Sequence, residues 1–148
     1  MDRERDIGFA VRRLSNLIKR DIEKSRGKLG IDPVKGVNGW AINYFYENRS
    51  RDIFQKDFET NFSIRRSTAS RILKTMEQKG LIERLSVESD ARLKKIVLTD
   101  AAIEIHKRIT EEIAEREKRL RMGIDEADLD VFFEVINRLS FNMEEHDD

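Results

Sequence analysis

Apolar residues recur every three or four positions in several long segments of the chain, which is the spacing of amphipathic helices. The first such segment spans residues 6–24. Its apolar positions are Ile7, Phe9, Ala10, Leu14, Leu17, Ile18 and Ile22. Gly27, Gly30 and the pair Asp32-Pro33 follow. Because glycine and proline interrupt helices, we expect this helix to end near Ser25 and a loop to follow it.

A second helix, with an aromatic stripe, is predicted over residues 34–48. Its apolar positions are Val37, Trp40, Ala41, Tyr44 and Phe45. Packing in the core is the simplest explanation of such a stripe. The alternative is an aromatic-lined cleft that accepts a small apolar or aromatic ligand. Gly36 and Gly39 lower the helix propensity, but they permit close approach to a neighbouring helix.

Two helices joined by a short turn are predicted next. Asp52 is placed to cap a helix from Ile53 to about Thr60, and residues 61–63 form the turn. The following helix begins at Arg65 or Arg66 and ends near Lys79. Its inward residues are Ala69, Ile72, Leu73 and Met76, and its outward residues are Arg66, Ser67, Ser70, Arg71 and Lys74. A small inward alanine and a polar outward face are typical of a helix-turn-helix.

A β-hairpin and two long helices complete the predicted elements. After Gly80, one strand runs to about Ser86 and the returning strand covers residues 94–98. Thr99 is expected to cap a helix over residues 100–122, and Asp125 to open a last helix to about residue 143. The predicted fold is mainly α with a small β-hairpin wing (α+β), a winged helix-turn-helix with helical dimerisation arms.

Three parts of the chain follow from this order of elements. Residues 1–33 form an N-terminal dimerisation helix and loop, residues 34–99 the winged helix-turn-helix DNA-binding domain, and residues 100–148 the C-terminal dimerisation helices. The first helix and the last two carry more apolar surface than one small winged domain can cover. A helical dimer interface is therefore expected.

Composition excludes several classes of protein. The 148 residues include no cysteine, so neither disulfides nor thiolate metal sites are possible. The N-terminal residues contain no uninterrupted apolar run, so we expect no signal peptide or membrane span there and a cytoplasmic location. His106 is interpreted as packed at a helix interface rather than as a metal ligand. The absence of catalytic and phosphate-binding motifs predicts a protein that is not an enzyme, with no cofactor and no metal.

The net charge of zero hides a segregation of charge along the chain. Residues 63–95 hold nine Lys and Arg against four acidic residues, a net charge of +5. Residues 125–148 hold nine acidic residues against Arg138 alone, a net charge of −8. The middle of the chain thus has the basic character that a DNA partner requires.

The outward residues of the second helix of the predicted helix-turn-helix suit direct reading of DNA. Short hydroxyl side chains stand near its N-terminus, where such a helix lies deepest in the major groove, and arginines beside them can reach guanine edges or phosphates. The candidate DNA-binding residues of this helix are Arg65, Arg66, Ser67, Thr68, Ser70, Arg71 and Lys74. Taken alone, these residues fit a solvated surface helix equally well.

The basic hairpin favours the DNA-binding interpretation. Arg92, with Lys94 and Lys95 beside it, suits insertion toward a narrow, negatively charged minor groove. Asp90 is expected to pair with Arg92 and to fix the shape of the wing rather than to contact DNA.

From Ile53 to Thr99 the sequence resembles the MarR family of bacterial winged helix-turn-helix regulators. The motifs that carry the resemblance are STASR (67–71), MEQKGLIER (76–84), and DAR (90–92) followed by Leu98-Thr99. The resemblance implies an obligate homodimer whose first and last two helices intertwine, and two winged domains that read a pseudo-palindromic operator. It also implies a small anionic or aromatic effector, which we place near Trp40, Tyr44 and Phe45.

The sequence therefore predicts a homodimeric, double-stranded-DNA-binding transcriptional regulator, acting as a ligand-responsive repressor. The alternative is a winged-helix dimer that serves as a protein-interaction scaffold without specific DNA readout.

Overall fold

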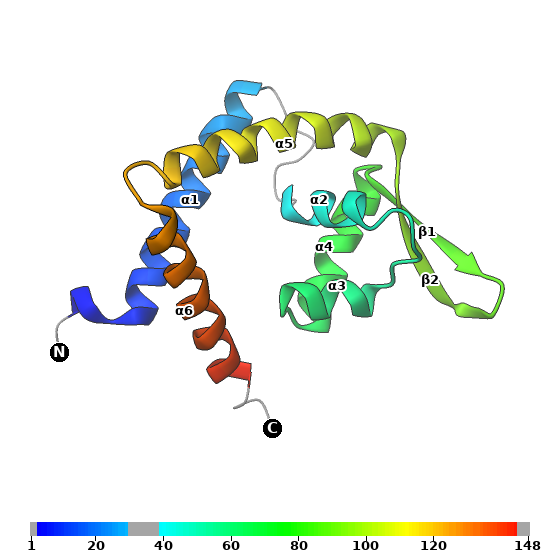
Figure 1. The fold of residues 1–148 in the computed structure, drawn as a ribbon. Coiled ribbons are helices and arrows are strands. Elements are labelled where there is room, and N and C mark those ends of the chain that lie inside the picture. The colour runs from blue at the N-terminus through cyan, green and yellow to red at the C-terminus, as the bar shows by residue number, and fades with distance from the viewer. Residues whose placement is uncertain (1–2, 30–38, 145–148) are drawn as a thin grey trace. The chain divides into compact units, whose positions relative to one another are not determined.

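The structure is a computed structural model that describes residues 3–29 and 39–144 (Figure 1). Its elements are the 3-10 helix η1 (Arg3–Arg5), the helices α1 (Ile7–Leu29), α2 (Gly39–Glu47), α3 (Gln55–Phe62) and α4 (Arg66–Gln78), the strands β1 (Ile82–Val87) and β2 (Asp90–Leu98), and the helices α5 (Asp100–Leu120) and α6 (Glu126–Glu144). The predicted mainly helical fold with one hairpin is confirmed. The chain forms two compact units, Met1–Thr110 and Glu111–Asp148, which are described separately below.

The first two helices differ from their predicted extents. α1 continues to Leu29, beyond the predicted end near Ser25, because one glycine inside a helix costs only about 1 kcal/mol. The predicted start of the second helix, with Gly36 and Val37, lies outside the described residues. In α2 the fully buried apolar side chains are Ala41 and Ile42, whereas Trp40 is 42% exposed. The prediction that Trp40 packs in the core is therefore wrong, and Ile42, which the predicted stripe did not include, is buried instead.

The predicted cap of α3 is wrong as well. The residue at the N-cap is Phe54 rather than Asp52. Asp57 in the first turn accepts a hydrogen bond from the Phe54 N–H at 2.9 Å, which satisfies a donor that the helix itself leaves unpaired. At the other end of α3, Ser63 adopts a left-handed conformation with φ of 49°. This conformation ends the helix and starts the turn toward α4.

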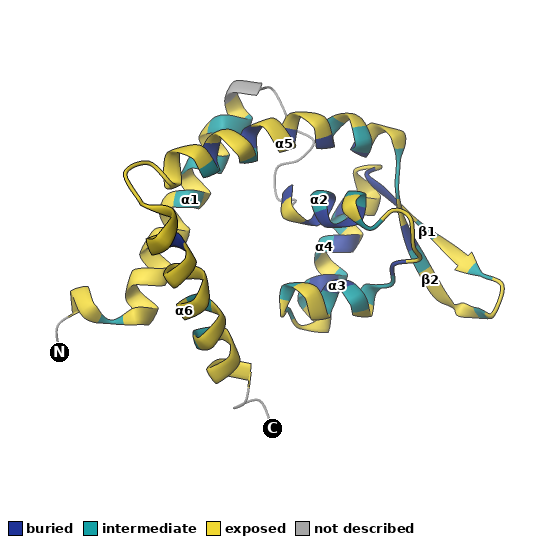
Figure 2. Cartoon of the chain, viewed as in Figure 1, coloured by how far each residue is buried: buried dark blue, intermediate teal, exposed yellow. Residues whose placement is uncertain are grey.

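The core of the first unit lies between α2, α3, α4, the base of the hairpin and the first half of α5 (Figure 2). Its largest fully buried side chains are Phe58, Ile42, Ile53, Leu73, Met76, Leu81, Ile82 and Ile109. The Phe58 ring packs against Phe45 and Phe62, with centroid distances of 5.3 and 4.9 Å. Aromatic pairs of this kind add packing energy beyond the area they bury. The helix-turn-helix is thus fixed on a rigid apolar base.

The hairpin is antiparallel and longer than predicted. The regular pairing of β1 with β2 begins with Ile82 opposite Leu98 and ends with Ser86 opposite Lys94. An irregularity follows between Ser86 and Val87. Ile96 N–H donates to the Ile53 carbonyl at 2.7 Å, so the segment before α3 is tied to β2. As predicted, Thr99 caps α5, because its Oγ1 accepts a hydrogen bond from Ala102 N–H. The hairpin projects beyond the helices of this unit (Figure 1).

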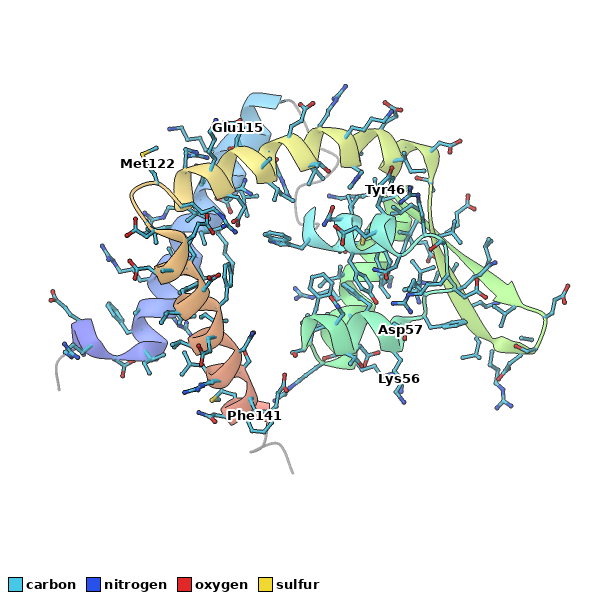
Figure 3. All side chains as sticks on the ribbon, viewed as in Figure 1. Tyr46, Lys56, Asp57, Glu115, Met122 and Phe141 are labelled. Carbon is cyan, nitrogen blue, oxygen red and sulfur yellow. The ribbon has the colours of Figure 1, made fainter. Side chains whose placement is uncertain are left out.

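The second unit consists of the end of α5 and of α6. Within it, Glu112 and Arg116 form a buried ion pair along one face of α5. Gly123 has a φ of 75° in the turn before α6. α6 exposes Val131, Phe132, Phe133, Val135, Phe141 and Met143, and Phe141 is visible near its C-terminal end (Figure 3). Within the described residues, no helix is both long and apolar enough to cross a membrane.

Candidate nucleic-acid interface

The outward face of α4 is polar, basic and accessible. Arg65, Arg66, Ser67, Arg71 and Lys74 are exposed, and Thr68 and Ser70 are half-buried at its margins. The N-cap position is taken by Arg65, whose side chain caps no backbone group. Free N–H groups in the first turn of a helix, together with its dipole, favour a phosphate. Every residue predicted to read DNA from this helix is therefore placed at or beside the accessible face.

Gln55, at the start of α3, contacts this face and was missed in the sequence. Its Nε2 lies 2.9 Å from Ser70 Oγ and 3.5 Å from the carbonyl oxygen of Arg66. Because one amide reaches two positions of α4, it fixes the first turns of the two helices against each other.

At the tip of the wing, Asp90 pairs with Arg92 as predicted. Asp90 Oδ1 accepts a hydrogen bond from Arg92 N–H at 2.8 Å and lies 3.7 Å from Arg92 Nε. The Arg92 side chain is 95% exposed. The carboxylate thus holds the backbone of the tip while leaving the guanidinium accessible.

The three basic residues of β2 do not share one face of the strand. Side chains alternate along the regularly paired part of β2, so Lys94 lies on the face that also carries the buried Ile96, and Lys95 lies on the other face. Lys94 Nζ donates to Ser86 Oγ across the hairpin at 2.6 Å. Lys95 instead pairs with Asp52 at 3.6 Å. The geometry therefore separates Lys94 from Lys95, and Arg92 lies at the tip beyond the regularly paired residues.

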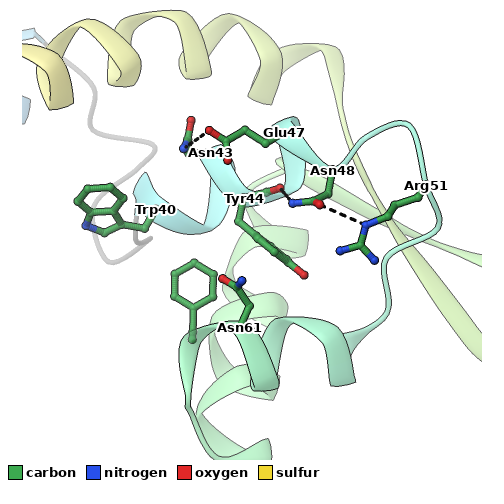
Figure 4. A pocket seen from close by; sticks show the side chains of 8 residues that line it. Trp40, Asn43, Tyr44, Glu47, Asn48, Arg51 and Asn61 are labelled. Atoms are coloured by element: carbon green, nitrogen blue, oxygen red, sulfur yellow. Dashed lines mark hydrogen bonds between the residues drawn. The ribbon is translucent and has the colours of Figure 1, made fainter. Parts of the chain in front are cut away.

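A first cavity of about 360 Å³ lies beside α2 and the C-terminal end of α3 (Figure 4). Its lining combines the Trp40, Tyr44 and Phe62 rings with Asn43, Glu47, Asn48, Arg51 and Asn61. Asn43 donates to Glu47 Oε1, and Arg51 Nε donates to Asn48 Oδ1. The charges of Glu47 and Arg51 offset each other, so this cavity offers aromatic rings and amides rather than a net charge.

A second cavity of about 360 Å³ lies at the base of the wing. It is bounded by the segment between α2 and α3, by the end of β2, and by Phe45 and Ile103. Arg49, Arg51 and Lys95 line it against the single acid Asp52. The three residues proposed for an effector are therefore divided, with Trp40 and Tyr44 at the first cavity and Phe45 at the second.

His106 of α5 is packed against Tyr46 of α2, at a helix interface as predicted, and is 8% exposed. Its ring stacks on Tyr46 at a centroid distance of 3.8 Å, and Arg49 lies 3.9 Å from the Tyr46 ring. Burial lowers the pKa of His106, Glu47 raises it and Arg49 lowers it further. Among the residues that the structure describes, no three His, Asp or Glu side chains cluster closely enough to hold a metal ion.

The region of the chain that forms this surface also carries a family match. The model of the MarR family matches residues 48–94, from just after α2 to the middle of β2, which is about a third of the chain. Over this segment the chain is similar to the MarR family. A curated relative, the HTH-type transcriptional regulator BilQ of Clostridioides difficile (strain CD3), is 28% identical over 75 residues. The match covers 51% of this chain and about half, 51%, of that relative.

Solved structures share the fold over nearly the whole chain. MepR of S. aureus in complex with DNA has 20% sequence identity and a TM-score of 0.81, covering 95% of this chain and 98% of that one. The heme sensor protein PefR of Streptococcus agalactiae in complex with heme has 23% identity and a TM-score of 0.66, covering 97% and 99%. The fold is therefore that of the MarR-like winged helix.

Proposed function

We propose that this chain is a MarR-type homodimeric repressor that binds a pseudo-palindromic operator and responds to a small ligand. The observation that carries the proposal is the joint exposure of the basic face of α4 and of Arg92 on the adjoining wing. A helix of this kind reads base edges in the major groove, while a basic wing enters the minor groove. The solved structure of MepR, whose fold this chain shares, is that of MepR in complex with DNA.

The dimer is supported by apolar surface that the chain leaves uncovered. α1 exposes Ile7, Phe9, Val11, Leu14 and Leu17, and α6 exposes six further large apolar residues. Monomeric proteins rarely expose patches of this extent. A twofold dimer would set two α4 helices about 34 Å apart on an inverted repeat. Repression would follow from its occupation of the promoter.

An effector that is anionic is proposed to bind the second cavity. Three cations line it against one acid, and its volume lies within the range of small-molecule sites. Phe45 and Ile103 line the same cavity and offer apolar contact to a ligand. The first cavity suits a neutral aromatic ligand instead.

PefR binds heme in its solved complex, but the described part of this chain fits heme poorly. His106 is the one histidine there. It is buried against Tyr46, and its Nε2 lies 3.3 Å from Thr110 Oγ1. Its Nδ1 makes no hydrogen bond but is buried, so neither ring nitrogen is accessible to an iron.

The experiment that tests the proposal measures affinity for selected genomic fragments as a function of salt. A regulator should prefer an inverted repeat and lose affinity steeply as salt rises, with a slope that reflects several phosphate contacts. Arg92→Ala should weaken binding, and Glu88→Ala at the same tip provides a control that removes no cation. A weak, sequence-independent affinity would favour the protein-interaction scaffold.

A further inference from the structure

Gln55 and Ser70 form the contact between α3 and α4 nearest to the proposed reading surface. Both residues are half-buried, and they are joined by the 2.9 Å hydrogen bond between Gln55 Nε2 and Ser70 Oγ. Ser70 follows Arg66 by four positions and precedes Lys74 by four, so these side chains lie along one side of α4. Ser70 therefore stands at the edge of the face that is proposed to meet DNA.

The surroundings of Gln55 fix which end of its amide faces α4. The same nitrogen approaches the Arg66 carbonyl oxygen at 3.5 Å, and a carbonyl only accepts hydrogen bonds. The amide NH2 group, not its oxygen, must therefore be directed at α4. It follows that Gln55 donates and that Ser70 Oγ accepts.

This direction determines what Ser70 can offer to a ligand. A hydroxyl carries one hydrogen and two lone pairs, and Gln55 occupies one lone pair on the α3 side. In the described part of the chain, the Ser70 hydroxyl makes one side-chain hydrogen bond, which it accepts from Gln55. Its own hydrogen is left for an acceptor outside the protein.

We propose that Gln55 is a positioning residue that makes Ser70 a hydrogen-bond donor toward the major groove. Ser70 would then select bases that present an acceptor, such as guanine O6 or N7 or thymine O4, over cytosine, which presents an amino donor. The assignment rests on the proposed function, because it requires that α4 lies in the groove.

The test measures, for the full chain, the relative affinity of all four base pairs at each operator position. Ser70→Ala identifies the position read by Ser70 as the one whose base preference it flattens, by about 2-fold to 10-fold for one hydrogen bond. Gln55→Met keeps the side-chain length but removes the donor, and should weaken the preference at that position alone. Gln55→Glu makes the partner an acceptor. Ser70 must then donate to it, so the preference should shift toward a base with an amino group.

Comparing base pairs within one variant cancels the general effect of its charge on DNA affinity. Lys56→Gln is the matched control, because it changes the net charge by the same amount as Gln55→Glu. Lys56 is exposed on the same helix (Figure 3). This control should leave the preference unchanged.

Three outcomes separate the possibilities. If Ser70→Ala alters the preference at no position, or if both Gln55 variants keep the wild-type preference where Ser70→Ala loses it, the proposal is overturned. Circular dichroism verifies the fold, and Gln55→Met alone decides if Gln55→Glu does not fold. A wild-type chain with no preferred sequence would contradict the proposed function itself, and this assignment with it.

Discussion

The conformation of the wing tip depends on a single carboxylate. Asp90 Oδ1 accepts the Arg92 N–H and stands beside its guanidinium, so one oxygen both shapes the backbone and orients the side chain. Its negative charge acts in the opposite sense, because it repels a DNA phosphate. The two effects can be separated by substitution.

We therefore predict that Asp90→Asn binds operator DNA at least as tightly as the wild type. The amide oxygen keeps the acceptor, and one repulsive charge is removed. Asp90→Ala also removes the charge but loses the acceptor, so it should bind about 3-fold to 10-fold more weakly than Asp90→Asn. Fluorescence anisotropy at fixed salt measures the difference. Equal affinities of the two variants would show that the shape of the tip does not depend on this hydrogen bond.

At the scale of the elements, close approach to the start of α2 depends on a glycine. A Cβ at Gly39 would lie 2.7 Å from Arg26 Nη2 and 3.1 Å from Ile109 Cγ2. The end of an arginine side chain can move, but Ile109 is fully buried. The methyl group must therefore displace part of the core, which agrees with the role in close approach that the sequence predicted for Gly39.

We predict that Gly39→Ala lowers the free energy of unfolding by about 1–2 kcal/mol through overpacking. Gly27→Ala is the matched control. Gly27 lies within α1, and a Cβ there would meet no atom within 4 Å. That substitution should raise stability by about 0.5–1 kcal/mol, the usual gain over glycine inside a helix. Urea denaturation of both variants measures the contrast, and shifts of the same sign would contradict it.

Features that depend on residues close together in the sequence could be predicted, and contacts between residues far apart in the sequence could not. The outward face of α4, the hairpin, the Thr99 cap and the Asp90–Arg92 pair follow from residues within a few positions of one another. The contact of Gln55 with Ser70 joins residues fifteen apart, and the Lys95–Asp52 pair joins β2 to the segment before α3. Helical spacing and turn signals contain no information about such pairs. For the same reason, the sequence suggested Asp52 as the N-cap of α3, whereas Asp52 pairs with Lys95 and Phe54 is the N-cap.

At the scale of the whole molecule, exposed apolar residues indicate where a second copy would bind. Leu14 and Leu17 are exposed on the stripe that the spacing of α1 defines. Lys19 lies on the opposite side of the helix, about 140° from Leu14 and about 160° from Leu17 at 100° per residue. Burial of such a stripe in a dimer would contribute about 25 cal/mol for each Å² removed from water. A charge on the stripe would have to be desolvated, whereas the side chain at Lys19 would stay in water.

We predict that Leu14→Glu shifts the protein from dimer to monomer in sedimentation equilibrium at micromolar concentration. Lys19→Gln, which changes the net charge by the same amount, should remain a dimer. Because two linked reading heads bind an inverted repeat far more tightly than one, Leu14→Glu should lose at least about 100-fold in affinity for the full operator. Its affinity for an isolated half-site should change little, since α4 and the wing are untouched. If Leu14→Glu stays dimeric with operator affinity intact, the interface does not include this stripe of α1. If Lys19→Gln dissociates as readily, the dimer is sensitive to charge alone and the stripe has no special role.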